Sequence, residues 1–127
     1  MIKRTNNKII KSKGGKIFKI LNRNSIYFKN FGEIYLNHIR KSTKKTDWIF
    51  HKSCQCLITA TDGKINFIFK KNLNKKKVIT LESKKNQLLT IPPKTWFRFE
   101  CKTDKATFLN LIDRIHDPKE TIRDSVD

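Results

Sequence analysis

The sequence predicts an all-β protein in which short antiparallel strands close into a jelly-roll barrel. From Lys16 onward, short apolar segments recur with turn residues between them, which is the spacing typical of a β-sandwich or barrel. Residues 32–40 alternate between two sets of side chains, as the two faces of a strand do. Asp62-Gly63 lies between two apolar runs and is typical of a β-hairpin turn. A chain of 127 residues is large enough for one hydrophobic core. We therefore expect a single barrel domain.

The first residues are expected to be attached loosely to this barrel. Residues 1–15 are polar and basic, and they end in Gly14-Gly15, so we interpret them as a flexible basic arm. The barrel domain then spans residues 16–127 and begins with strands at 16–21 and 25–28. In the next strand, at 32–40, alternation predicts two faces: Ile34, Leu36 and His38 on one, and Glu33, Tyr35, Asn37 and Ile39 on the other.

The remaining elements follow from the turns that bound them. A short strand ends in His51, the Asp62-Gly63 hairpin joins two longer strands, and further apolar runs lie on both sides of Pro92-Pro93. The tail has helical character, because Asp117 can cap a first turn that contains Pro118. The expected segments are strands at 48–51, 55–61, 64–70, 78–82, 88–91, 96–101 and 107–113, followed by a short helical tail at 117–127.

The chain is strongly basic, with 29 Lys and Arg against 11 Asp and Glu and a formal net charge of +18. Such a charge attracts nucleic acid, an anionic membrane or a small phosphorylated ligand. Most of the cations are Lys, and the chain is also rich in Asn and Ile, so we interpret much of the charge as compositional drift on a solvated surface. A field of this sign would still draw a diphosphate into a cleft.

The composition also predicts the compartment. No stretch approaches the ~20 apolar residues of a membrane span. The basic N-terminus lacks an apolar core region and a small-residue cleavage site, so we expect no secretory signal and a cytoplasmic location. Cys54, Cys56 and Cys101 make an odd count, which argues against a disulfide framework.

His51 is the first candidate for chemistry, because an imidazole on a strand that faces a barrel interior can act as a general base near neutral pH. The alternative is a hydrogen-bonded, inert histidine on the rim. His38 and His116 are weaker candidates, since one lies on an apolar strand face and the other opens the tail.

We expect neither a metal nor an organic cofactor. Cys54 and Cys56 form a C-x-C pair without a second pair, and with one nearby imidazole they fall short of the three or four ligands of a stable site. The sequence holds no phosphate-binding loop, Rossmann glycine pattern or nucleophile elbow. A nucleotide would therefore be held by side chains.

Residues 96–101 offer a second group of candidates. Alternation places Trp96, Arg98 and Glu100 on one face, and Phe97 and Phe99 on the other, where they would join the core. A base or sugar could stack on Trp96, and the guanidinium of Arg98 could form an ion pair with a phosphate. The alternative is an outer face buried in a dimer interface.

These features resemble, in their order, the sugar-nucleotide branch of the cupins, which includes the WxcM-like 3,4-ketoisomerases and the RmlC-like 3,5-epimerases of deoxysugars. The motifs are GEIYLNHI at 32–39, the strand that ends in His51, TDGKINFIF at 61–69, LLTIPPKTW at 88–96, ATFLNLID at 106–113 and HDPKETIR at 116–123. The resemblance implies a metal-free homodimeric jelly roll that acts on a nucleoside-diphosphate (dTDP-linked) 4-keto-6-deoxysugar for surface polysaccharides.

The resemblance assigns His51 as the proton-transfer base. Family positions with other functional residues read Ile49, Cys56 and Phe97 here, and the expected tyrosine acid near 110–115 is missing. Lys52, Tyr35 or Arg98 could substitute for the missing acid. The candidates for binding the substrate are Trp96, Arg98, Lys52, Tyr35 and Asn110.

Two other functions stay open. The missing acid favours a catalytically inactive cupin that binds a sugar nucleotide or a partner enzyme. A basic nucleic-acid-binding barrel is less favoured, because the aromatic residues follow core periodicity and the cations are scattered along the sequence.

Overall fold

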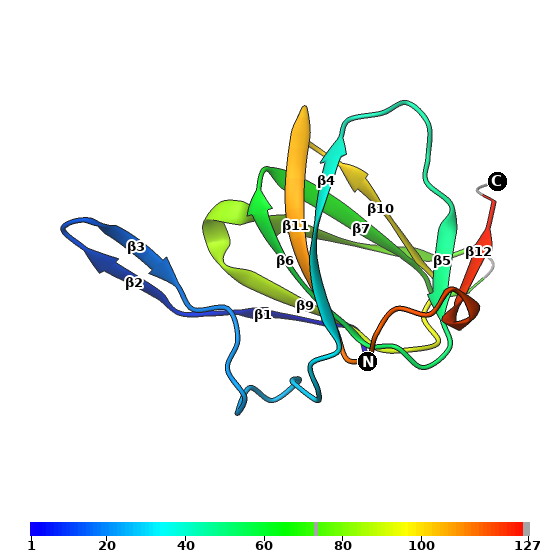
Figure 1. Ribbon diagram of the computed structural model, residues 1–127. Coiled ribbons are helices and arrows are strands. Elements are labelled where there is room, and N and C mark those ends of the chain that lie inside the picture. The colour runs from blue at the N-terminus through cyan, green and yellow to red at the C-terminus, as the bar shows by residue number, and fades with distance from the viewer. Residues whose placement is uncertain (73, 126–127) are drawn as a thin grey trace.

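The computed structural model describes residues 1–72 and 74–125, and strands form nearly all of its regular structure. Two five-stranded antiparallel sheets enclose a common core (Figure 1). The first sheet consists of β1 (Lys3–Asn6), β9 (Gln87–Ile91), β6 (Cys56–Asp62), β11 (Lys105–Ile112) and β4 (Glu33–Arg40), in this order. The second consists of β12 (Thr121–Asp124), β5 (Trp48–His51), β10 (Phe97–Cys101), β7 (Lys64–Lys70) and β8 (Lys76–Glu82). The all-β barrel predicted from the sequence is confirmed.

Aromatic side chains fill the space between the sheets. Phe67 and Phe108 meet edge to face with ring centroids 5.4 Å apart, and Phe99 and Phe108 do so at 5.1 Å. Burying a side chain of this size contributes about 1.5–3 kcal/mol. Alternation along β7 and β10 brings these rings inward from the second sheet to meet Phe108 of the first.

Strand β4 shows the two faces that its alternation predicts. Tyr35 and Ile39 pack against the core, whereas Ile34 and Leu36 are 48% and 51% exposed. His38 lies on the exposed face, where its Nδ1 is 2.9 Å from Thr107 Oγ1. The more polar face of β4 therefore points into the barrel.

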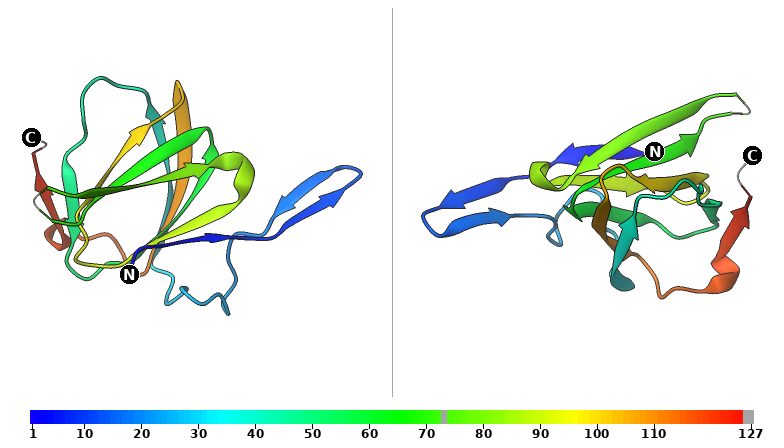
Figure 2. Two further views of the ribbon diagram at one scale, coloured as in Figure 1. Left: turned by 180° about the vertical axis from the view of Figure 1, so that it is seen from behind. Right: turned by 90° about the horizontal axis from the view of Figure 1, so that it is seen from above.

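The N-terminal residues are more structured than the sequence suggests. β1 adds to the first sheet by pairing with β9, and β2 (Ile9–Ser12) and β3 (Gly15–Phe18) form a separate hairpin. The expected boundary at residue 15 falls inside this hairpin, which projects away from the barrel in every view (Figures 1 and 2). Residues 25–28, expected as a strand, form a turn instead, with the amides of Ser25 and Phe28 bonded three residues back.

The expected helical tail at 117–127 is confirmed for one turn only, and residues 126–127 lie outside the described residues. Only Pro118–Glu120 form a 3-10 turn, and Asp117 caps it by accepting a hydrogen bond from the Lys119 amide at 3.0 Å. The chain then continues as β12, which pairs with β5. The free edge of β5 and the β-branched pair Thr121-Ile122 favour a strand over further helix.

Candidate active site

A cavity of about 220 Å³ opens between the two sheets at the end of the barrel where β5 and β12 meet. The apolar part of its lining comes from five strands, β5, β6, β7, β10 and β11. The apolar lining residues are Ile49, Ile58, Phe67, Phe97, Phe99 and Phe108. Such a lining excludes water and strengthens the polar interactions made inside it.

Seven polar side chains converge on this cavity from both sheets and from the tail. These residues are Tyr35, Asn37, His51, Asn110, His116, Thr121 and Arg123. An apolar pocket with a few convergent polar groups is the usual form of a small-molecule site. The cavity is therefore the candidate active site.

His51 is held at the mouth of this cavity by two neighbours. Its Nδ1 lies 3.0 Å from Thr121 Oγ1, and its ring packs on Phe97 with centroids 5.9 Å apart. When the Thr121 hydroxyl accepts the Nδ1 proton, Nε2 carries the lone pair of a base. The register that pairs His51 with Thr121 across β5 and β12 thus orients the imidazole.

The surroundings of His51 favour its neutral form. Burial lowers the pKa of the imidazole below its ordinary value, and the positive charges of His116 and Arg123 lower it further. The carboxylate of Glu120 acts in the opposite direction. A lowered pKa leaves the imidazole unprotonated at neutral pH, as a general base requires.

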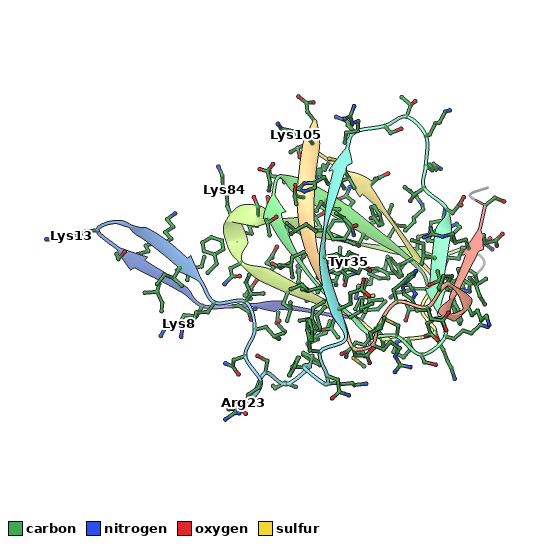
Figure 3. The ribbon with its side chains drawn as sticks, in the orientation of Figure 1. Lys8, Lys13, Arg23, Tyr35, Lys84 and Lys105 are labelled. Atoms are coloured by element: carbon green, nitrogen blue, oxygen red, sulfur yellow. The ribbon has the colours of Figure 1, made fainter. Side chains whose placement is uncertain are left out.

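Tyr35 lies on β4 (Figure 3), and its side chain lines the same cavity. Asn110 Nδ2 donates a hydrogen bond of 3.1 Å to the Tyr35 hydroxyl oxygen, which leaves the phenolic proton free for a ligand. Burial is the main reason that the pKa of Tyr35 rises to about 12. The phenol therefore stays protonated throughout the physiological range and can act as an acid or a hydrogen-bond donor.

The tail closes the cavity by binding the segment after β5. Glu120 Oε1 accepts hydrogen bonds from the Ser53 and Cys54 amides, the latter at 2.7 Å. Asp113 Oδ1 accepts one from the Gln55 amide at 3.1 Å. These carboxylates fix the chain between β5 and β6 directly beside His51.

The structure unites only part of the predicted site. His51, Tyr35 and Asn110 line the cavity. Trp96 and Arg98 lie on the outer face of the second sheet, because Phe97 and Phe99 take the inward positions of β10. Lys52 is exposed on the bend that follows β5.

Three polar residues of the cavity come from the tail, and the sequence singled out only one of them, His116, as a weak candidate. Thr121 and Arg123 alternate on β12 and so share its inward face. Recognising 121–124 as a strand would have revealed them.

The described residues contain no group of three or more His, Cys, Asp or Glu side chains placed to hold a metal ion. They also contain no helix that is long and apolar enough to cross a membrane.

A known protein family matches nearly the whole chain. The family described as "FdtA: WxcM-like, C-terminal" matches residues 2–127. The chain belongs to the WxcM-like family. A search of curated proteins finds no significant match.

Solved structures similar to this WxcM-like chain are sugar-nucleotide enzymes. A dTDP sugar isomerase from Desulfovibrio desulfuricans G20 is 25% identical with a TM-score of 0.86, over 99% of this chain and 85% of that one. A mutant of the 3,4-ketoisomerase QdtA from Thermoanaerobacterium thermosaccharolyticum, in complex with TDP-4-keto-6-deoxyglucose, is 20% identical with a TM-score of 0.83, over 97% and 87% of the two chains. The TDP-quinovose 3,4-ketoisomerase WlaRB from Campylobacter jejuni is 18% identical with a TM-score of 0.82, over 97% and 92%.

Proposed function

We propose that this protein isomerises a nucleoside-diphosphate 4-keto-6-deoxysugar by enolisation next to the ketone, and that the sugar is linked to dTDP. The observation that carries the proposal is that His51 and Tyr35 line one cavity, whose other walls are partly aromatic and aliphatic. Enolisation needs a base for the C–H proton and a donor for the oxygen that gains charge. The WxcM-like family and its solved neighbours supply the substrate class.

The proposed reaction uses the two side chains in complementary roles. His51 Nε2 takes the proton from the carbon beside the ketone, and the C–H electron pair becomes the C=C bond of an enediol. Tyr35 gives its proton to the ketone oxygen, and Asn110 stabilises the phenolate that forms by its hydrogen bond. For ketone migration, the neighbouring hydroxyl then returns a proton to Tyr35 while His51 protonates the former carbonyl carbon, so all protons balance.

The test is proton NMR of TDP-4-keto-6-deoxyglucose with the purified protein in D2O. We expect deuterium to enter at C3 or C5, and a general base contributes about 10²–10⁴-fold to such a step. His51→Gln should lose that factor and still bind the nucleotide, and Tyr35→Phe should slow the exchange. His38→Gln, which changes an exposed histidine outside the cavity, is the matched control.

A second function is favoured by one observation. Ile49 and Phe97 line the cavity at positions where the family resemblance leads us to expect histidines. Without them the protein could be an inactive cupin that binds the sugar nucleotide or a partner enzyme. Saturable broadening of the nucleotide resonances without any deuterium exchange would establish that function and refute the isomerase.

The assembly and location that we propose rest on separate features. The β2–β3 hairpin projects from the barrel without a sheet partner of its own, so we propose that it packs against a second copy in a homodimer. Cys54, Cys56 and Cys101 are buried free thiols, which suits the reducing cytoplasm. There the enzyme would supply a deoxysugar for surface polysaccharides.

A further inference from the structure

The outer face of the second sheet carries a cluster of aromatic and basic side chains that has no part in the cavity. The register that pairs Phe97 with Ile49 also puts Trp48 across from Arg98 and Phe50 across from Trp96. Lys70 follows on β7, opposite Lys76 of β8. Side chains from four adjacent strands thus gather on one surface, on the opposite side of the sheet from His51.

Three cations surround one indole ring in this cluster. Lys70 Nζ lies 4.7 Å from the Trp48 ring centroid, Arg98 Cζ lies 5.3 Å from it, and Lys76 Nζ 5.7 Å. Lys70 Nζ is also 5.4 Å from the centroid of Trp96. The ring faces attract each cation, but they leave its positive charge uncompensated.

Acidic groups neutralise little of this charge. Glu100 Oε2 lies 3.6 Å from Arg98 Nη1, and its side chain is half exposed. Asp124 lies across from Trp48 in the β5–β12 register but forms no ion pair within the described residues. Lys70 and Lys76 likewise have no ion-pair partner in the described part of the chain.

Buried donors without acceptors lie at the centre of the same cluster. The Trp48 side chain is fully buried, the Arg98 side chain is 6% exposed, and their Nε1, Nε and Nη1 atoms find no hydrogen-bond partner among the described residues. Leaving a buried donor without an acceptor destabilises the folded state, so a ligand that supplies the acceptor would be favoured. The ammonium groups of Lys70 and Lys76 lie over the same indole ring, so an anion drawn to them would lie close to these donors.

We propose that Trp48, Lys70, Lys76 and Arg98 form a second ligand site that takes a phosphate or diphosphate group. A planar guanidinium matches phosphate oxygens in a bidentate fashion, and two lysines add mobile point charges. Three converging cations suit the charge of a diphosphate better than that of a single carboxylate. This site is separate from the catalytic cavity and does not depend on the function proposed for it.

The position of the tryptophans allows a direct test. The chain has two tryptophans, Trp48 and Trp96, and both belong to this cluster, whereas no tryptophan lines the cavity. We would titrate the full chain with inorganic pyrophosphate at constant ionic strength and follow tryptophan fluorescence. We expect a saturable change that weakens at least tenfold in the double variant Lys70→Gln/Lys76→Gln.

Matched controls separate a site from general charge attraction. Lys11→Gln/Lys13→Gln on the projecting hairpin also lowers the net charge from +18 to +16 and should bind like the wild type. Arg98→Lys keeps the positive charge but removes the planar guanidinium, so it should weaken pyrophosphate binding. His51→Gln should leave the fluorescence titration unchanged, because it alters the cavity alone.

Two results would overturn the proposal. One is a response that does not saturate or that sodium chloride reproduces at equal ionic strength. The other is an equal loss of pyrophosphate affinity in the two double-lysine variants, which would show that the net charge alone determines binding. A parallel titration with long-chain polyphosphate identifies the source of the group: affinity that grows with chain length indicates a polymer, and equal affinity indicates a small ligand.

Discussion

At the scale of single residues, the candidate site depends on two opposite shifts of pKa. Burial lowers the pKa of His51 and raises that of Tyr35, so one group is ready to accept a proton and the other to give one. Both shifts favour the neutral form, which an apolar cavity stabilises over a charged one. The same lining therefore prepares both partners of the proposed reaction.

The direction of the His51 shift predicts how activity depends on pH. In the proposed mechanism the neutral imidazole is the active form, so kcat/KM should fall on the acid side at a pH below 6.5, the ordinary pKa of histidine. Glu120 raises the pKa of His51, so Glu120→Gln should move this limb to still lower pH. Kinetic pH profiles and NMR titration of the His51 ring would measure the shift.

Glu100→Gln is the control, since this carboxylate lies on the outer face of the sheet, beside Arg98. An acid limb that stays in place or moves upward in Glu120→Gln would contradict the assignment of His51 as the base. Tyr35 should add no alkaline limb below about pH 12.

At the scale of elements, the β6–β7 hairpin is the feature that the sequence predicts best. Gly63 has a φ of +73°, a region that glycine occupies at no steric cost. A Cβ atom at this position would lie 2.6 Å from the Lys105 carbonyl oxygen. The turn therefore needs glycine for its backbone conformation and for its packing.

Replacing this glycine tests that statement. Gly63→Ala should lower the free energy of unfolding by roughly 1–3 kcal/mol, because alanine is strained at this positive φ and its Cβ would also clash with the Lys105 carbonyl oxygen. Gly14→Ala is the matched control, since an added Cβ meets nothing within 4 Å there. Urea denaturation of the three proteins would measure the difference, and equal stability of both variants would refute the argument.

Strands with a clear apolar alternation were predictable, and polar ones were not. β4, β7 and β10 follow their residue patterns, because one face of each strand must be buried. β1 (KRTN) and β12 (TIRD) are short and charged, and they form by pairing with edges supplied from distant parts of the chain. Nothing local in the sequence encodes those partners.

The same reasoning explains the site. Alternation separated Tyr35 from Ile34 and Leu36 on β4, but it did not predict that the more polar face of this strand would point inward. Alternation likewise separated Trp96 and Arg98 from the inward Phe97, but it could not decide whether their face was the ligand face. That decision depends on which sheet lies opposite, which is a property of the whole barrel.

At the scale of the whole molecule, the projecting hairpin is the least self-sufficient part. An isolated two-stranded hairpin is marginally stable in water. Ile10 and Ile17 pair across its strands, and Ile17 is 56% exposed. A second copy that covers this apolar pair would remove it from water.

The hairpin therefore gives a prediction about assembly. We expect the wild type to be a dimer by light scattering coupled to size-exclusion chromatography, and Ile10→Lys/Ile17→Lys to be a monomer, because charged ends cannot be buried without partners. Lys11→Gln/Lys16→Gln, the neighbouring cross-strand pair, should remain dimeric. A monomeric wild type, or a dimeric isoleucine variant, would rule out this interface.

The pairing of His51 with Thr121 has a consequence for how the protein is made. The two residues lie 70 positions apart, and Ser53 and Glu120 lie 67 apart. A chain that emerges from the ribosome N-terminus first can form β4 to β11 before these partners exist. In the proposed mechanism, proton transfer would thus begin only after β12 docks, because nascent and prematurely terminated chains would lack the partner that orients His51.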